Sequence, residues 1–236
     1  MLKERQKLIL DAIIREHIKT ARPVASKDLI EDFRLDFSPA TIRGEMLRLD
    51  ELGYLEQPHT SAGRIPTDQG YRFFVDHLVK NFNLGERENQ ILCRAFETKR
   101  EDEFIKEFSR VVSGLSETFA AVGSWDEELF YETGFTEILA EPEFQQPEEI
   151  KTFGKFIDFL DERIRGIMQG DSSLEEKIFI GEENPLKEAK RYTMAFSSWS
   201  HPQGFGGFLT LVSPKRTNYG RQKAVLRSIK KIQNER

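Results

Sequence analysis

The sequence is poor in cysteine and has no long apolar run, and both absences limit what the protein can be. A single cysteine, Cys93, stands among 236 residues, which excludes an internal disulfide framework and fits a reducing cytoplasm. No run of about 18 apolar residues occurs, so no membrane-spanning helix is expected. The first ten residues, MLKERQKLIL, lack an apolar segment followed by a cleavage site, so they do not predict a secretory signal. We therefore expect a soluble cytoplasmic protein.

The sequence also lacks the motifs of common enzyme classes. It contains no nucleophile elbow, Walker loop or Cys–His pairing signature. The Gly-rich segment HPQGFGG lies between predicted strands and offers no helix start for a phosphate, so it predicts a hairpin connection. We expect no catalytic residue, no cofactor and no metal. The four histidines are far apart in sequence and none has a metal-ligand spacing: His17, His59, His77 and His201.

An excess of positive charge, typical of a nucleic-acid-binding protein, is missing as well. The chain has 35 Lys and Arg against 40 Asp and Glu, a net charge of −5. Residues 1–80 carry equal numbers of both signs, so the deficit lies in the remainder. Binding to DNA would therefore rely on the local placement of a few cations, with weak non-specific affinity that falls as salt rises. The candidate cations are Lys27, Arg43, Arg48, Arg64 and Arg72.

What the sequence does contain is a pattern of three short helices at its start. Apolar residues at helical spacing predict an amphipathic helix over residues 3–20, which cannot continue past Pro23. Ser26 is predicted to cap a second helix over residues 27–33. Residues 34–37 have the length of the turn in a helix-turn-helix. A third helix follows, which Ser38 caps and Pro39 opens.

The third helix divides into two faces at about 3.6 residues per turn. Arg43 on the polar face can reach guanine O6 and N7, and Thr41 can contact a phosphate or a thymine methyl group. Ser38 and the free N–H groups of the helix start can bind a phosphate. These positions could also be ordinary solvated residues. The predicted buried face is Ile42, Met46, Leu49 and Leu52, and the predicted DNA face is Ala40, Thr41, Arg43, Gly44 and Arg48.

A short ribbon is predicted directly after this helix. Gly53 ends the helix, and residues 54–57 and 64–66 flank the turn PHTSAG, in which no apolar side chain is larger than Ala62. A helix followed by a ribbon with a small polar tip is the layout of a winged helix-turn-helix, which places a helix in the major groove. The predicted DNA-binding residues outside the third helix are Ser26, Lys27, Ser38, His59, Thr60, Ser61, Gly63 and Arg64.

The middle of the chain is predicted to be helical. A helix that starts at residue 67 or 68 closes the DNA-binding domain, residues 1–80, and NFNLGE forms a linker. Two further helices are expected at about residues 86–98 and 102–122. The second has an apolar seam, which is either a dimer contact or the core-facing side of an intramolecular helix: Phe104, Phe108, Val111, Leu115, Phe119 and Val122. Residues 81–123 are therefore assigned to a helical linker with helices that could serve in dimerisation.

The last part, residues 124–236, predicts an α+β domain. Strands followed by a helix in this order favour an antiparallel sheet with helices on one face. The predicted strands are 129–132, 177–180, 192–199 and 207–212, the predicted helices are 147–168 and 218–233, and residues 134–140 form a short helix or a turn.

Several of these segments resemble the heat-inducible transcription repressor family (HrcA). The resemblance is carried by PVASKDL, SPATIR and LDELGYLEQPHTSAGRIPTDQGYR, and more weakly by GFTEILAEPEF, IGEENPL and LVSPKRTNYGR. It implies a winged helix-turn-helix followed by a GAF-like effector domain. It also implies a homodimer that binds an inverted-repeat operator in double-stranded DNA upstream of chaperone genes and is released on heat stress. The family's activity is tuned by the GroEL chaperonin.

The sequence departs from the family pattern in two places. Gly44 stands where the family usually has Asn, which would suit a bidentate contact with adenine that Gly cannot make. The chain is also shorter than the usual member, with material missing between Val122 and Leu129, which predicts a reduced GAF-like domain with flanking helices. The sequence thus predicts a dimeric repressor of chaperone genes. The alternative is a non-enzymatic regulatory or interaction protein that keeps the winged-helix fold and has altered or lost operator specificity.

Overall fold

The computed structural model describes residues 2–33, 36–79, 82–126, 128–170 and 177–235. The chain forms two compact units, one of Met1–Lys80 with Lys215–Thr217 and one of Asn81–Pro214 with Asn218–Arg236. The first unit ends at the residue where the sequence analysis places a boundary. Residues 81–123, expected as a separate linker, fall in the second unit because their helices and first strand pack within it.

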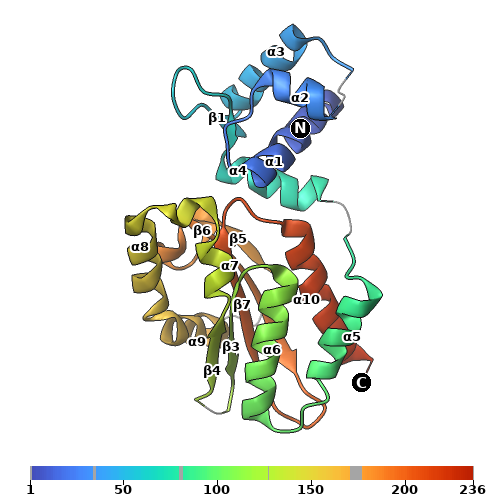
Figure 1. The fold of residues 1–236 in the computed structure, drawn as a ribbon, viewed down its shortest axis with the longest axis vertical. Coiled ribbons are helices and arrows are strands. Elements are labelled where there is room, and N and C mark those ends of the chain that lie inside the picture. Colours follow the sequence, from blue (N-terminus) through green and yellow to red (C-terminus); the bar gives the residue numbers. More distant parts are fainter. Residues whose placement is uncertain (1, 34–35, 80–81, 127, 171–176, 236) are drawn as a thin grey trace. The chain divides into compact units, whose positions relative to one another are not determined.

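The first unit consists of helices and a two-stranded ribbon (Figure 1). The predicted helices and the ribbon are present, with bounds close to those expected. The helices are α1 (Glu4–Thr20), α2 (Ser26–Phe33), α3 (Pro39–Glu51) and α4 (Asp68–Phe73), and α4 continues into the π-helical segment η1 (Phe74–Leu78). The antiparallel ribbon pairs β1 (Leu55–Glu56) with β2 (Ile65–Pro66).

The core of the first unit joins the apolar faces of its helices. Ile13, Leu29 and Ile42, from α1, α2 and α3, are all fully buried. The predicted buried face of α3 is correct for Ile42, Met46 and Leu49 but wrong for Leu52, which is 52% exposed. Leu52 is the C-cap of α3, and the chain turns away at Gly53, whose φ of 79° suits glycine.

The starts of α2 and α3 are capped differently. Ser26 was expected to cap α2, but it is the first residue of the helix. The backbone N–H of Ala25 instead donates to Oδ2 of Asp28 at 2.8 Å. Ser38 caps α3 as predicted, since its Oγ accepts from the N–H of Thr41 at 3.1 Å.

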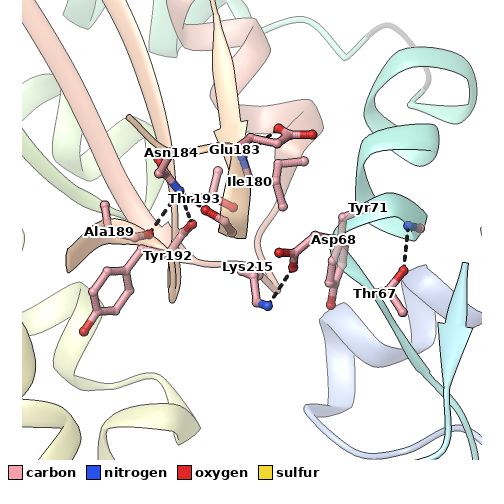
Figure 2. Close-up of polar contacts among 12 residues, drawn as sticks. Thr67, Asp68, Tyr71, Ile180, Glu183, Asn184, Ala189, Tyr192, Thr193 and Lys215 are labelled. Atoms are coloured by element: carbon pink, nitrogen blue, oxygen red, sulfur yellow. Dashed lines mark hydrogen bonds and ion pairs between the residues drawn. The ribbon is translucent and has the colours of Figure 1, made fainter. Parts of the chain in front are cut away.

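The start of α4 is held by a second cap. The hydroxyl of Thr67 accepts from the N–H of Gly70 at 3.1 Å (Figure 2). The same hydroxyl donates to the carbonyl of Gly53 at 2.6 Å. In the same turn Asp68 accepts a hydrogen bond from Nζ of Lys215 at 2.6 Å, which fixes the segment Lys215–Thr217 within the first unit (Figure 2).

The second unit is built on a five-stranded antiparallel sheet with strand order β4-β3-β7-β6-β5. The strands are β3 (Phe119–Ser124), β4 (Phe130–Thr133), β5 (Ile178–Ile180), β6 (Tyr192–Ser200) and β7 (Gly206–Pro214). HPQGFGG connects β6 to β7 as a hairpin, as predicted. The predicted α+β class with an antiparallel sheet is confirmed.

Helices cover both faces of this sheet, which corrects the expectation of one covered face. On one face α7 (Phe135–Leu139), α8 (Pro147–Ile157) and α9 (Leu160–Gly170) enclose an aromatic core that includes Phe153, Phe156, Tyr192 and Phe208. On the other face lie α6 (Glu101–Ser116) and α10 (Tyr219–Asn234), with α5 (Glu86–Ala95) packed against α6. Among its described residues the unit also contains three 3-10 turns, η2 (Pro142–Gln145), η4 (Gly181–Glu183) and η5 (Lys187–Ala189).

Two predicted helices differ from the structure. The helix expected over 102–122 ends at Ser116, because Glu117 is left-handed with φ 58°, and the chain then enters β3. Phe119 and Val122 therefore belong to the sheet. Phe104 and Phe108 on α6 are fully buried, so the seam faces the core. The helix expected over 147–168 is divided into α8 and α9.

A buried amide closes the connection between β5 and β6 (Figure 2). Asn184, 5% exposed, places Nδ2 at 3.0 Å from the carbonyls of Gly181 and Ala189 and at 2.8 Å from that of Tyr192. These bonds satisfy backbone groups that the short turns leave without partners. In the described ranges no helix is both long enough and apolar enough to cross a membrane.

Candidate nucleic-acid interface

The outward face of α3 carries five of the thirteen predicted DNA-contacting residues. Ala40, Arg43, Gly44 and Arg48 are exposed. Thr41 is half-buried, with its hydroxyl 2.9 Å from that of Ser38 at the start of the helix. The helix start therefore presents two hydroxyls and its first N–H groups, an arrangement suited to phosphate.

Leu47 is an exposed residue on this face that the sequence analysis missed. Its side chain is 52% exposed in the middle of the helix. Its spacing from Ala40, Arg43 and Gly44 is seven, four and three residues, which places all four side by side on one helical face. The sequence shows this spacing, but apolar residues usually lie in the core. Leu47 is therefore not among the predicted DNA-contacting residues.

Gly44 leaves an open place in this surface. A Cβ atom built on Gly44 would have no neighbouring atom within 4 Å. No packing constraint inside the unit therefore requires glycine at this position, and an interior helical glycine costs about 1 kcal/mol relative to alanine.

Arg48 is partly engaged by a buried carboxylate. Glu45, whose side chain is 3% exposed, accepts from Arg5 of α1 and from Nη1 of Arg48, the latter at 3.2 Å. Burial alone would raise the pKa of Glu45, but the hydrogen bond from Arg5 and the charges of Arg5 and Arg48 outweigh it, so the pKa is lowered. Glu45 thus stays ionised and neutralises part of the positive charge on the α3 surface.

The loop between β1 and β2 is ordered by a side chain that sequence reasoning did not select. Nε2 of Gln57 donates to the carbonyl of Thr60 at 3.0 Å and to that of Ala62 at 2.9 Å. The N–H of Ala62 donates to the carbonyl of His59 at 2.8 Å. His59, Thr60 and the next residue, Ser61, are exposed, so this loop presents small polar groups on a pre-formed turn.

Gly63 has a structural role at the base of the same loop. Val24 and Arg64 form an antiparallel bridge with two backbone hydrogen bonds of 2.9 Å. A Cβ atom on Gly63 would stand 2.3 Å from the carbonyl oxygen of Val24. Gly63 is therefore required by the close approach of two backbones.

Arg64 also acts within the protein. Its Nε lies 2.7 Å from Oδ2 of Asp50 on α3, and its side chain is only 16% exposed. The predicted contact of Arg64 with DNA would have to compete with this ion pair. Lys27, by contrast, is exposed on α2, while Ser26 is half-buried in its first turn.

The surface thus combines an exposed Arg43, an open helix backbone at Gly44, hydroxyls at the helix start and a polar loop. These groups suit contacts with phosphates and base edges. They do not form a metal centre: within the part of the chain that the structure describes, no group of three or more His, Cys, Asp or Glu could hold an ion.

A family model described as HrcA protein C terminal domain matches residues 69–222. Among similar proteins, the heat-inducible transcription repressor HrcA of Pelotomaculum thermopropionicum is 43% identical over 123 residues, which are 51% of this chain and 35% of that protein. The protein of the same name from Desulforamulus reducens is 45% identical over 121 residues, 50% of this chain and 35% of the relative. The matches thus span about a third of the length of these relatives.

The fold also occurs in a solved structure. A crystal structure of a hypothetical protein covers 99% of this chain and 98% of its own, with a TM-score of 0.75 and 20% sequence identity. At that identity the likeness shows the fold alone.

Proposed function

The chain belongs to the HrcA family, and from that membership we propose that it is a heat-inducible transcription repressor whose first unit is a winged helix-turn-helix that binds DNA. The observation that carries the proposal is the exposed face of α3, with Arg43 at its centre, in one unit with the ordered polar loop between β1 and β2. The names of the relatives support the repressor role.

In this proposal α3 enters the major groove and the β1–β2 loop lies along the backbone beside it. Arg43 contacts a guanine, since its guanidinium suits the O6 and N7 acceptors. Ser38, Thr41 and the N–H groups at the start of α3 bind phosphate. His59, Thr60 and Ser61 contact backbone or minor-groove groups. Ala40 and Gly44 leave room for close approach, and Lys27 and Arg48 add phosphate contacts.

We further propose that two chains bind one inverted repeat as a homodimer, with one first unit on each half-site. The second unit serves as a GAF-like effector and association domain, for which its five-stranded antiparallel sheet is suited. The GroEL chaperonin is the proposed partner that maintains the active form. Heat lowers the population of the DNA-binding dimer and so releases the operator.

Selection of duplexes from a randomised library by the purified chain tests the DNA-binding role. We expect enrichment of an inverted repeat whose half-sites lie on one face of the duplex. Binding to the selected repeat should then be lost over the heat-shock range, below the temperature at which the chain unfolds globally. A library that remains random after repeated rounds contradicts the repressor proposal. Binding that persists up to global unfolding contradicts the heat-release step alone.

One observation supports a second candidate function. Three of the five candidate cations are paired within the protein: Arg48 with Glu45, Arg64 with Asp50 and Arg72 with Asp76. A winged-helix protein with so few unpaired cations could serve as a regulatory interaction module without base readout. Such a module would show no enrichment in the selection, and it would show no dependence of its partner binding on the DNA sequence.

A further inference from the structure

An exposed leucine lies where the proposed reading helix would meet the bases. Leu47 is 52% exposed, although the other long apolar residues inside α3, Ile42, Met46 and Leu49, are buried. A solitary exposed leucine needs no explanation in general. The position of Leu47 does need an explanation. Leu47 shares a single face of α3 with Ala40, Arg43 and Gly44, at the spacing i, i+3, i+4 and i+7.

The residues around Leu47 make it protrude. Gly44, three residues earlier, has no side chain, and nothing lies within 4 Å of the position of its Cβ. Ala40, two turns earlier, adds only a methyl group. Of these four residues only Arg43 and Leu47 therefore have long side chains, one cationic and one apolar, with the exposed Arg48 next to Leu47.

The major groove offers one apolar feature to such a side chain, the C5 methyl group of thymine. We propose that Leu47 reads a thymine methyl group in each half-site and is a specificity-determining residue of this chain. The inference rests on the proposed DNA-binding function. Four residues of helix rise by about 6 Å, so the thymine should lie within about two base pairs of the guanine bound by Arg43, at about 3.4 Å per step.

Substitution of thymidine by deoxyuridine tests this contact, since it removes the methyl group and leaves every hydrogen-bonding atom unchanged. Each thymidine of the selected repeat is replaced in turn, at the same place in both half-sites. For the unmodified chain we expect one position at which affinity falls about fourfold per half-site, the change expected for one lost buried methyl group. Leu47→Ala should bind the thymidine and deoxyuridine duplexes equally well at that position.

Two variants complete the design. Leu52→Ala is the matched control, because Leu52 is also 52% exposed but is the C-cap of α3, beyond the last helical residue Glu51. It should keep the methyl dependence of the unmodified chain. Leu47→Met retains an apolar side chain and should keep discrimination between the two duplexes, which separates a lost contact from a disturbed helix.

The outcomes separate the inference from the proposed function. If the unmodified chain selects no duplex, the DNA-binding proposal fails and the assignment of Leu47 fails with it. If the chain binds its repeat but Leu47→Ala retains the same methyl dependence, only the assignment of Leu47 is overturned. Loss of self-association in Leu47→Ala, with methyl dependence unchanged, would likewise overturn it and assign Leu47 to a protein contact.

Discussion

Nε of Arg64 lies 2.7 Å from Oδ2 of Asp50, and this ion pair joins the base of the β1–β2 loop to the last turns of α3. Arg64 is also the residue whose backbone bridges to Val24. One arginine therefore sets the position of the loop relative to the helix that we propose reads DNA. Its partly buried geometry gives the pair more effect than a fully exposed one would have.

Arg64→Ala and Arg43→Ala should therefore have different effects. Arg64→Ala should lower the free energy of unfolding of the first unit by about 1 kcal/mol and weaken DNA binding through the displaced loop. Arg43→Ala should leave stability unchanged and weaken specific binding by about 1–3 kcal/mol. Urea unfolding and fluorescence anisotropy measure the two effects. Equal stability loss in both variants would contradict the distinction.

Gly63 and Gly44 should respond to alanine in opposite directions. Gly63→Ala forces a methyl group against the carbonyl of Val24 and should destabilise the first unit by about 1–3 kcal/mol. Gly44→Ala meets open space and should stabilise α3 by about 1 kcal/mol.

Far-UV circular dichroism follows the helices of both units, whereas both tryptophans, Trp125 and Trp199, report on the second unit. Both glycine variants should leave the tryptophan transition in place. A Gly63→Ala chain as stable as the unmodified one would contradict the close approach.

Gly44→Asn should change base preference. The added amide can donate to and accept from adenine N7 and N6, a contact that glycine cannot make. A randomised operator library should yield a different consensus at one position per half-site. An unchanged consensus would mean that this part of α3 does not face the bases.

Glu132 should make the second unit less stable as pH rises. Burial, then repulsion from Asp161 and Asp158, raises the pKa of Glu132 from 4.5 to about 7. The folded chain therefore keeps a proton that the unfolded chain has already lost, so the free energy of unfolding falls between about pH 4.5 and 7 and then levels off. Asp161 itself is paired with Arg165 at 2.6 Å, which moderates its repulsion of Glu132.

Glu132→Gln removes this titration. Its tryptophan-detected urea midpoint should exceed that of the unmodified chain at pH 8, and the difference should shrink towards pH 5. Glu137→Gln, an exposed change on α7, serves as the control. A pH-independent difference between Glu132→Gln and the unmodified chain would rule out the raised pKa.

The local features of the first unit were predictable from the sequence because they depend on near neighbours. Ser38 and Pro39 predicted the start of α3, and Gly53 predicted its end. The helical spacing of Ile42, Met46 and Leu49 predicted its buried side. Leu52 continued that spacing yet lies outside the core, since a residue at the cap no longer follows the helix.

The missed features depend on contacts distant in sequence. Nothing near Arg64 or Gly63 shows that Asp50 and Val24 will meet them, so both residues were assigned to DNA by residue type. Phe119 and Val122 continued a helical spacing by coincidence, and only the left-handed turn at Glu117 places them in β3. The predicted DNA face of α3 omits Leu47 because apolar residues usually lie in cores.

Anisotropy of labelled duplexes over a salt series tests the central claim most directly, with the family's inverted repeat, a single half-site and a scrambled duplex. We predict tight binding to the repeat, much weaker binding to the half-site, little to the scramble, and affinity that falls as salt rises. Equal, weak and salt-sensitive binding to all three would show a protein that holds phosphates without reading bases, and would contradict its assignment as a sequence-specific repressor.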